Sequence, residues 1–331
     1  MALRFIAVVG WALLLPRWAS SQSLTLDVTQ TAGYSTEEVG ALGTQARALA
    51  ETASGLRFSI EAAWAARSDT SSDVFGAAYP YANRLQVIEA FAERTFLPDG
   101  RLFSVRAGRF RTPFGISSGS DHAYIGFHRA PLIRYDGYYA LSNNCLEHGV
   151  DVVAGVPRLS VELSAGVPAD VGSAVRRSAM DLVVRGQGAY SDAVVGASYI
   201  RTNPYQPASY AAGRMEFGGV DVRWMHAGIQ VRGEWLAGRP FDGTTTRGGY
   251  VDVIVHRPRM GVVTALLRAE RLDYEAEPPH ELYMHRYSAA SSIRLFAHLS
   301  AQVALVHQPA AAHSSRSTAL DLGVMYSLRP H

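Results

Sequence analysis

The sequence contains no lysine, only one cysteine and few charged residues for a chain of 331 residues. Charged residues make up 18 % of it, against about a quarter in a typical soluble globular protein. The single cysteine, Cys145, excludes a scaffold held together by disulfides. The hydrophobic share of 48 % is too high for a disordered chain. Because all 31 basic residues are arginine, two interpretations stay open: a compositional bias of the genome, or a pore lined by permanently charged anion binders.

Apolar runs of the roughly 18 residues that a membrane helix needs are also missing beyond the N-terminus. This absence excludes a helical membrane protein. Residues 5–15 are apolar, follow Arg4 and precede the small residues Ala19-Ser20-Ser21, which is the pattern of a secretory signal. We therefore expect residues 1–21 to be a signal peptide and residues 22–331 to form one domain.

Charge is balanced in the expected mature chain. The signal takes two of the 31 arginines, Arg4 and Arg17, and leaves 29 basic against 29 acidic residues. Strong nucleic-acid binding needs a basic patch, and no basic run follows. A nucleic-acid partner is therefore not expected.

Apolar residues recur at every second position along much of the mature chain. Residues 158–165 read Arg-Leu-Ser-Val-Glu-Leu-Ser-Ala, so the even positions are polar and the odd positions apolar. Residues 56–64, 229–235 and 320–328 carry a similar alternation. A strand with one apolar face and one wet face must show this period.

About fifteen segments near the length of a tilted membrane strand carry this pattern. They span residues 24–32, 55–67, 83–96, 101–110, 146–156, 158–167, 178–187, 190–201, 215–226, 228–237, 249–257, 260–272, 283–295, 298–307 and 317–328. Single-chain bacterial barrels have an even number of strands. We therefore expect 14 or 16 strands and look for a missed strand within 122–142. Residues 36–52 are expected to form a short helix in the first outer loop.

The connections alternate between short turns, such as 98–100, 155–157 and 257–259, and longer polar stretches, such as 202–214 and 238–248. Short periplasmic turns and longer outer loops are typical of outer-membrane barrels. A soluble secreted β-sandwich is the alternative, but its outward face would carry more charge. Tryptophans near predicted strand ends match the aromatic girdles of a membrane barrel. The sequence thus predicts an all-β fold: a transmembrane antiparallel up-and-down β-barrel in the lipid of a Gram-negative outer membrane.

The longest connection, residues 117–145, carries several arginines and carboxylates. Arg109 and Arg111 precede it two positions apart, which points both side chains to one side of an extended backbone. Pro113 cannot donate to a ladder and should end the strand. A long loop folded into the lumen would narrow a channel and select by charge and size. An ordinary surface loop is the alternative.

Residues Ala107-Gly-Arg-Phe-Arg-Thr-Pro-Phe-Gly-Ile116 resemble a segment of the phosphate-selective porin family (porin O and P type), in which a strand ends in a Gly-x-Phe-x-x-Pro-Phe-Gly-like run before a long loop. Residues 89–93 and 269–273 resemble two further strands of that family. The resemblance implies an outer-membrane barrel that passes small anionic or general solutes, and porins of this kind commonly form homotrimers. Two departures leave phosphate selectivity open: the chain has no lysine, and it runs past the usual terminal aromatic to His331.

Catalytic and metal-binding patterns are weak. Residues 115–119 match Gly-x-Ser-x-Gly, but that motif needs a strand-to-helix elbow in an α/β sheet. His122 and His128 fit no closed zinc spacing, and Cys145 has no recognisable base beside it. No Gly-rich phosphate loop precedes a helix. We therefore expect no cofactor, no metal and no enzymatic activity.

The predicted function is a porin that lets small hydrophilic solutes diffuse passively through a water-filled channel, with a preference for anions. A barrel enzyme and a non-conducting barrel scaffold are the alternatives. The predicted pore-lining residues are the charged side chains expected on inward faces and in the long loop: Arg57, Glu61, Arg109, Arg111, Arg134, Arg223, Arg232, Glu234 and Arg268.

Overall fold

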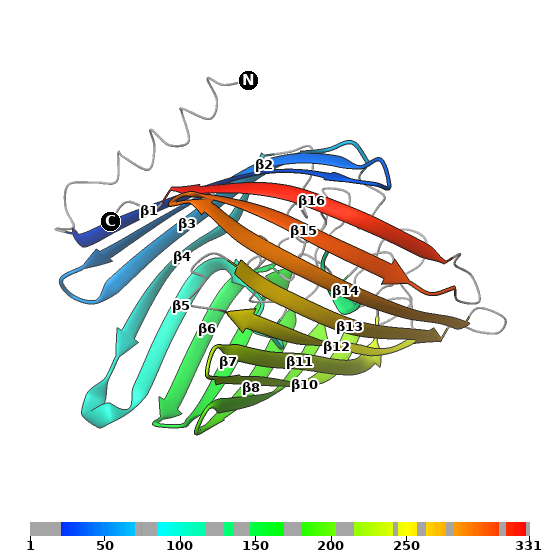
Figure 1. Cartoon of the computed structure of the whole chain (residues 1–331). Helices are drawn as coiled ribbons and strands as arrows, with labels where there is room; N and C mark the ends of the chain where they lie inside the picture. Colours follow the sequence, from blue (N-terminus) through cyan, green and yellow to red (C-terminus); the bar gives the residue numbers. More distant parts are fainter. Residues whose placement is uncertain are drawn as a thin grey trace.

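The computed structural model describes residues 21–69, 74, 85–116, 129–134, 146–168, 180–202, 215–240, 244–256, 263–275, 281–310 and 316–328. Within these ranges the chain forms sixteen strands, which close into one antiparallel barrel (Figure 1). Each strand pairs with its neighbours in sequence, and β1 closes the ring by pairing with β16. A closed sheet has no free edge, so its backbone groups are satisfied even in lipid.

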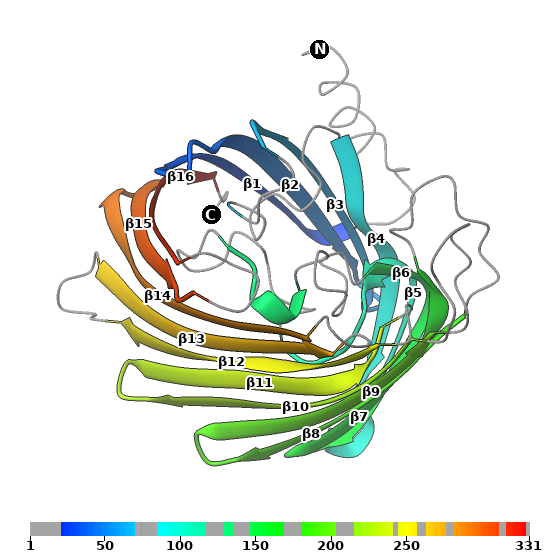
Figure 2. The same ribbon diagram turned by 90° about the vertical axis from the view of Figure 1, so that its right-hand side faces the viewer.

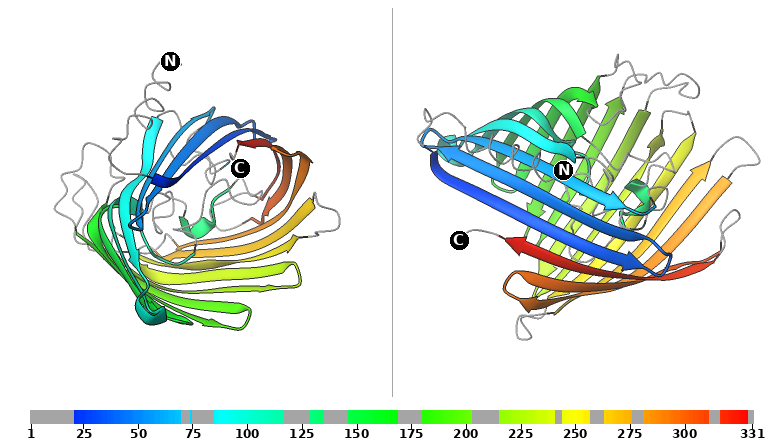
Figure 3. Two further views of the ribbon diagram at one scale, coloured as in Figure 1. Left: turned by 90° about the vertical axis from the view of Figure 1, so that its left-hand side faces the viewer. Right: turned by 90° about the horizontal axis from the view of Figure 1, so that it is seen from above.

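The first eight strands are β1 Ser21–Ser35, β2 Gly40–Thr52, β3 Leu56–Arg67, β4 Leu85–Phe96, β5 Leu102–Arg111, β6 Leu146–Val156, β7 Leu159–Pro168 and β8 Asp181–Tyr190. The second eight are β9 Ala193–Thr202, β10 Met215–His226, β11 Ile229–Arg239, β12 Thr245–His256, β13 Val263–Glu275, β14 Glu281–Phe296, β15 Leu299–Gln308 and β16 Ser317–Leu328. The strands are tilted to the barrel axis (Figure 3), as closure of a sheet requires.

Side chains alternate between the two faces of the barrel wall. On β13, Arg268 and Glu270 are buried on the inner side, whereas Leu267 on the outer side is 59 % exposed. Large apolar residues are exposed on the outer face elsewhere too, as are Leu24 on β1 and Val184 on β8. An apolar outer wall with polar residues on the inner wall is the arrangement of a barrel in lipid. The predicted all-β transmembrane barrel is confirmed, with sixteen strands.

The strand missing from the fifteen predicted segments is β2, and its position corrects two predictions. The sequence predicts a short helix in the first outer loop for residues 36–52, and the alanines there are strong helix formers. They pair instead with β1 and β3 along almost their whole length, so strand pairing overrides local propensity. A strand within 122–142 is also wrong for the described part, where Leu132–Arg134 form the short 3-10 helix η2.

Short and long connections lie at opposite ends of the barrel. One end has tight turns, including the 3-10 turn η1 at Pro98–Gly100 and the turn at Pro157 and Arg158. The other end has most of the long connections, of which residues 112–145 form the longest. In outer-membrane barrels the short turns face the periplasm. Residues 1–20, which make up nearly all of the predicted signal peptide 1–21, lie outside the described residues, as does the predicted turn at 257–259.

The barrel interior holds described parts of the longest connection, η2 among them. The helix η2 lies inside the ring of strands (Figure 2) and is in contact with β12 and β13. No helix in the described ranges is long and apolar enough to cross a membrane.

Candidate functional site

After β5 ends at Arg111, the chain turns into the lumen. The amide of Gly115 donates to Ser198 Oγ at 3.1 Å, and the amide of Ile116 donates to Glu234 Oε2 at 3.2 Å. Ser198 lies on β9 and Glu234 on β11, so this segment crosses the interior from β5 to the far wall. Pro113 follows the end of β5, as expected for a residue that cannot donate to the ladder.

Gly115 is required where the segment meets the wall. Its φ is +60°, a left-handed conformation that L side chains rarely adopt. A Cβ at this position would lie 1.7 Å from Glu234 Oε1. A larger residue would therefore displace either the Glu234 carboxylate or the segment itself.

Three apolar side chains of the connection pack against the inner wall. Phe114, Leu132 and Ile133 are almost completely buried in one cluster with wall residues of β8 to β14. The wall residues in this cluster are Val183, Ile200, Met215, Phe217, Leu236, Tyr250, Leu272 and Met284. Their burial inside the barrel depends on the loop covering them, because an uncovered inner wall would face water.

Residues 129–134 form the return arm of the connection, which leads back toward β6. Its first residue, Arg129, binds the part of the barrel around β16 and β1. Arg129 binds Asp321 on β16 in a bidentate pair, with N–O distances of 2.9 and 3.1 Å, and lies 3.3 Å from Glu37. Ser35 Oγ on β1 donates to the same Asp321 at 2.6 Å. Bidentate arginine–carboxylate pairs fix orientation as well as adding energy.

The carboxylate of Glu270 on β13 binds the backbone at the start of η2. It accepts the Leu132 amide at 2.9 Å and also Arg286 Nε on β14 at 2.6 Å. Arg286 in turn donates to the Ala130 carbonyl. The hypothesis of a loop inside the lumen is therefore confirmed for residues 112–116 and 129–134, and a surface loop is excluded for them.

Two of the predicted site residues share one buried carboxylate. Arg232 on β11 and Arg268 on β13 both bind Asp252 on β12, each with a shortest N–O distance of 2.6 Å. All three side chains are buried, and Arg268 also donates to the Arg129 carbonyl at 3.3 Å. The cluster thus links three strands of the wall to the loop. A third predicted site residue in this region, Glu234, is also buried and accepts a hydrogen bond from the Ile116 amide.

A second buried pair joins β3 to the end of β5. Arg111 binds Glu61 at 2.7 Å and Glu89 on β4 at 3.1 Å, and Gln45 on β2 donates to Glu61 at 2.9 Å. Glu61 is fully buried. Arg109 donates to the Ile88 carbonyl at 3.1 Å. It pairs with Ala90 and His148 at outward positions of β4 and β6, so the prediction that it lines the pore is wrong. Arg109 follows the alternation of β5, whereas Arg111 departs from it at the end of the strand and reaches the inward Glu61.

The remaining predicted residues are less buried or lie outside the description. Arg57 is 44 % exposed and lies 3.6 Å from Glu93. Arg223 is half-buried and donates to Gln187 at 2.6 Å. The backbone of Arg134 ends η2, but its side chain lies outside the described residues, as do His122, His128, Cys145 and the serines of the Gly-x-Ser-x-Gly match.

Sequence reasoning missed Asp252, Glu270, Arg286 and Asp321. The register supplies the signal that could have found most of them: Asp252 lies directly opposite Arg232 and Arg268, and Glu270 directly opposite Arg286. Opposite charges at facing positions of adjacent strands stabilise a sheet. Aligning the predicted strands so that opposite charges face each other would therefore have revealed these ion pairs.

The inner wall carries further ion pairs beside the loop contacts. Arg106 binds Asp151 at 2.9 Å and lies 3.5 Å from Glu162, on β5, β6 and β7. Arg185 on β8 binds Asp221 on β10 at 2.8 Å. The described inner wall is therefore charged, and two pieces of the connection are fixed across the lumen that it surrounds.

Comparison with known proteins gives a fold and no family. No family model matches the sequence, and no curated protein matches it. Among solved structures, the barrel is similar to OmpF of Salmonella typhi in complex with daunomycin, at 12 % identity and a TM-score of 0.68 over 92 % of this chain and 97 % of that one. It is similar to the anion-selective porin of Comamonas acidovorans at 11 % identity and a TM-score of 0.61, over 92 % and 99 % of the two chains.

A third similar structure is OmpT of Vibrio cholerae in a trimer form, at 10 % identity and a TM-score of 0.60, over 92 % of this chain and 98 % of that one. At these identities the likeness establishes the fold alone. This chain therefore has the fold of bacterial outer-membrane porins, and its apolar outer wall agrees with a place in the outer membrane.

Proposed function

We propose that this protein is an outer-membrane porin: a water-filled channel for passive diffusion of small hydrophilic solutes, narrowed by residues 112–116 and 129–134. The observation that carries the proposal is the loop held inside a sixteen-stranded barrel by buried ion pairs, with Arg129 bound to Asp321 at one side. Sixteen strands leave an aqueous lumen, whereas barrels of about eight strands fill their own interior. A fixed loop narrows such a lumen without closing it.

Seven of the nine predicted pore residues divide into two roles in this proposal. Glu61, Arg111, Arg232, Glu234 and Arg268 are paired and mostly buried, so they shape the channel by holding the loop and the wall. Arg57 and Arg223 keep more exposure toward the lumen, and we assign to them the contact with solutes. Arg109 lies on the outer face and has no part in it, and Arg134 stays a prediction.

A preference for anions follows from this division. The carboxylates Glu61, Glu234 and Asp252 are buried, whereas Arg57 is 44 % exposed. Partly exposed guanidinium groups attract anions in a narrow, weakly screened passage. The resemblance of residues 107–116 to phosphate-selective porins supports an oxyanion, phosphate among them, as the preferred solute. The anion-selective porin of Comamonas acidovorans has the same fold.

The test is conductance across a planar lipid bilayer, with purified protein and a tenfold potassium chloride gradient. We expect discrete conductance steps and a reversal potential that favours chloride. The variant Arg57→Gln should shift the reversal potential toward zero, and the matched control Arg94→Gln, an arginine on the outer side of β4, should leave it unchanged. Absence of steps from folded, inserted protein would contradict the channel, and a cation-favouring potential would contradict only the anion preference.

We further propose a homotrimer with β2 and β3 at the interface. The outer face of β2 carries the small residues Ala46, Ala48 and Ala50, which lie opposite Ala62, Ile60 and Phe58 of β3. The alanines leave a shallow strip on β2 that a large side chain of another barrel can approach. Light scattering in detergent should give three chains per particle. Ala48→Arg should yield monomers and Ala197→Arg on the outer face of β9 should not. A monomeric wild-type protein would exclude this interface.

A further inference from the structure

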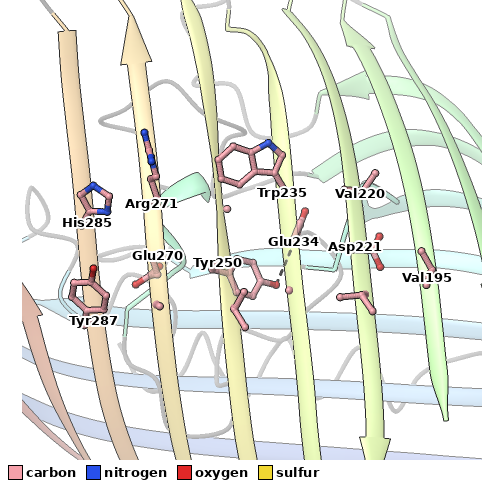
Figure 4. A pocket seen from close by; sticks show the side chains of 15 residues that line it. Val195, Val220, Asp221, Glu234, Trp235, Tyr250, Glu270, Arg271, His285 and Tyr287 are labelled. Carbon is pink, nitrogen blue, oxygen red and sulfur yellow. Dashed lines mark hydrogen bonds between the residues drawn. The ribbon is translucent and has the colours of Figure 1, made fainter.

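A hollow of about 540 Å³ lies in the outer wall of the barrel, between β9 and β14. The side chains around it on the outer face are apolar and exposed: Val220, Val222, Trp235, Val251 and Tyr287. Figure 4 shows Trp235, Arg271 and His285 around one end of the hollow and Tyr287 and Val195 farther along it. The hollow faces the lipid side of the wall and is separate from the lumen.

Small residues at outward positions create this hollow. Gly233 on β11 and Gly249 on β12 face outward at positions where β-barrels ordinarily carry large apolar side chains. A Cβ at Gly249 would lie 2.7 Å from the ring of Trp235, so the indole lies over this glycine. Gly233 and Ala269 have small or no side chains and therefore leave the adjacent part of the hollow unfilled. The result is an apolar depression with an aromatic wall.

Arginines border the hollow at its outer end. Arg271 lines it and shares the carboxylate of Asp273 with Arg247, at 2.8 and 3.1 Å. Asp273 is 1 % exposed, whereas both arginine side chains are about half exposed, at 48 % and 49 %. Arg247 also lies 3.5 Å from Glu275. Two guanidinium groups thus remain accessible on a wall that faces lipid.

The belt of arginines extends along the same end of the neighbouring strands. Arg239 ends β11 and is exposed, and Arg201 near the end of β9 lies 3.5 Å from Glu216. The described outward side chains there are Arg201, Arg239, Arg247 and Arg271 against Glu216, Asp273 and Glu275, a net charge of one positive unit. Lipid-facing charges are costly at the bilayer midplane and nearly free near its surface, which places this belt at the headgroup level of the outer leaflet.

We infer that this face binds a phosphorylated lipid of the outer leaflet, with its phosphate on Arg247 and Arg271 and one acyl chain in the hollow. Arginine binds phosphate oxygens through two parallel hydrogen bonds, and the hollow lies directly below these guanidinium groups. The positive charge beside an apolar depression selects an anionic amphiphile over a neutral one. A second copy of the chain is the less suitable occupant, because the interface proposed above for the trimer, at β2 and β3, lies on the far side of the barrel (Figure 2).

The experiment compares two lipids with the same acyl chains by native mass spectrometry of the full-length folded barrel. Dioleoyl phosphatidic acid carries the phosphate and dioleoylglycerol lacks it. We expect the barrel to retain about tenfold more of the phosphatidic acid, the effect of one or two charge-assisted hydrogen bonds. An excess of sodium phosphate should displace little of it, because free phosphate gains nothing from the hollow.

Two variants separate the headgroup contact from the acyl-chain contact. The triple variant Arg247→Gln, Arg271→Gln, Asp273→Asn removes the charges without leaving a buried carboxylate unpaired, and it should abolish the preference for phosphatidic acid. Ala269→Trp fills the hollow and should lower retention of both lipids. The controls are Arg94→Gln and Ala154→Trp, outward positions on β4 and β6 away from the hollow.

Equal retention of the two lipids by the wild-type barrel would overturn the inference. So would a triple variant that keeps the wild-type ratio while showing normal strand content by circular dichroism. Displacement of the lipid by sodium phosphate alone would show that the arginines bind phosphate without help from the hollow, and would equally refute the lipid site.

Discussion

Asp252 accepts hydrogen bonds from arginines on both neighbouring strands, Arg232 on β11 and Arg268 on β13. All three side chains are buried, so removal of the carboxylate charge takes from both guanidinium groups the ion pair that they share. Breaking one partner of a buried pair costs about 3–5 kcal/mol. We expect Asp252→Asn to lower the free energy of unfolding by that amount, measured by guanidinium chloride unfolding of the barrel in detergent and followed by tryptophan fluorescence.

Asp192→Asn is the matched control for this prediction. Asp192 lies in the turn before β9, and its exposed carboxylate binds the exposed His226 at 2.7 Å. An exposed pair of this kind contributes about 0–1 kcal/mol. If both variants unfold at the same denaturant concentration, the shared carboxylate does not stabilise the wall as argued.

Gly115 offers a second prediction at the scale of one residue. Gly115→Ala should cost about 1–2 kcal/mol for the left-handed backbone alone, and more because its Cβ would meet the Glu234 carboxylate. Thermal unfolding by circular dichroism should show a lower midpoint than in the wild-type barrel. In the background of Glu234→Ala the loss should be smaller by about 1 kcal/mol, because the clash is gone. Equal losses in both backgrounds would contradict contact between the two residues.

Most strands could be predicted from the sequence because a barrel wall between lipid and water imposes the period of two directly on the chain. β7 shows this best, since Leu159, Val161 and Leu163 all lie exposed on the outer face. β2 was missed because three successive outward residues, Ala46, Ala48 and Ala50, are alanines, which carry little hydrophobic contrast and favour helices in isolation. Its strand state depends on pairing with β1 and β3, which no local pattern reports.

The position of the long connection could be only a hypothesis before the structure was known. Its contacts join residues far apart in sequence: Leu132 with Glu270, and Arg129 with Asp321. Nothing in residues 117–145 alone distinguishes these contacts from solvation of a surface loop. For the same reason Glu234 and Arg268 could be assigned to the inner face, while their burial beneath the loop could not.

At the scale of one element, the ion pairs of Arg129 fix the return arm of the long connection to the barrel wall. Arg129→Gln removes the bidentate pair with Asp321 and the contact with Glu37, and leaves the apolar packing of Phe114 and Ile133 in place. We expect the barrel to stay folded while the return arm gains freedom. Single-channel recordings should then show greater current noise and brief closures that the wild-type channel lacks.

A control for loop freedom uses a pair elsewhere on the inner wall. Arg106→Gln breaks the pair with Asp151 without touching a described residue of the connection. This variant should keep quiet, wild-type-like steps. Equal noise in both variants would mean that the fluctuation comes from the wall and that Arg129 does not fix the loop.

At the scale of the whole molecule, barrel closure constrains where the chain can be processed. β1 begins at Ser21 and pairs with β2 from its first residue, with a register shift between Ser21 and Ser23. The sequence predicts a signal peptide of residues 1–21. Cleavage there would remove one residue of β1 ahead of the register shift and leave the regular ladder from Ser23 onward complete.

We therefore expect the protein isolated from outer membranes to begin at Gln22, as determined by intact mass and by sequencing of its first peptide. Cleavage several residues later would remove ladder positions such as Leu24, which pairs with Ala50, and would expose part of the edge of β2. An exposed strand edge in lipid leaves backbone groups unsatisfied, so later cleavage should lower thermal stability. A membrane-inserted protein that retains Met1, or one that begins beyond Leu24 with undiminished stability, would contradict this account of how β1 completes the barrel.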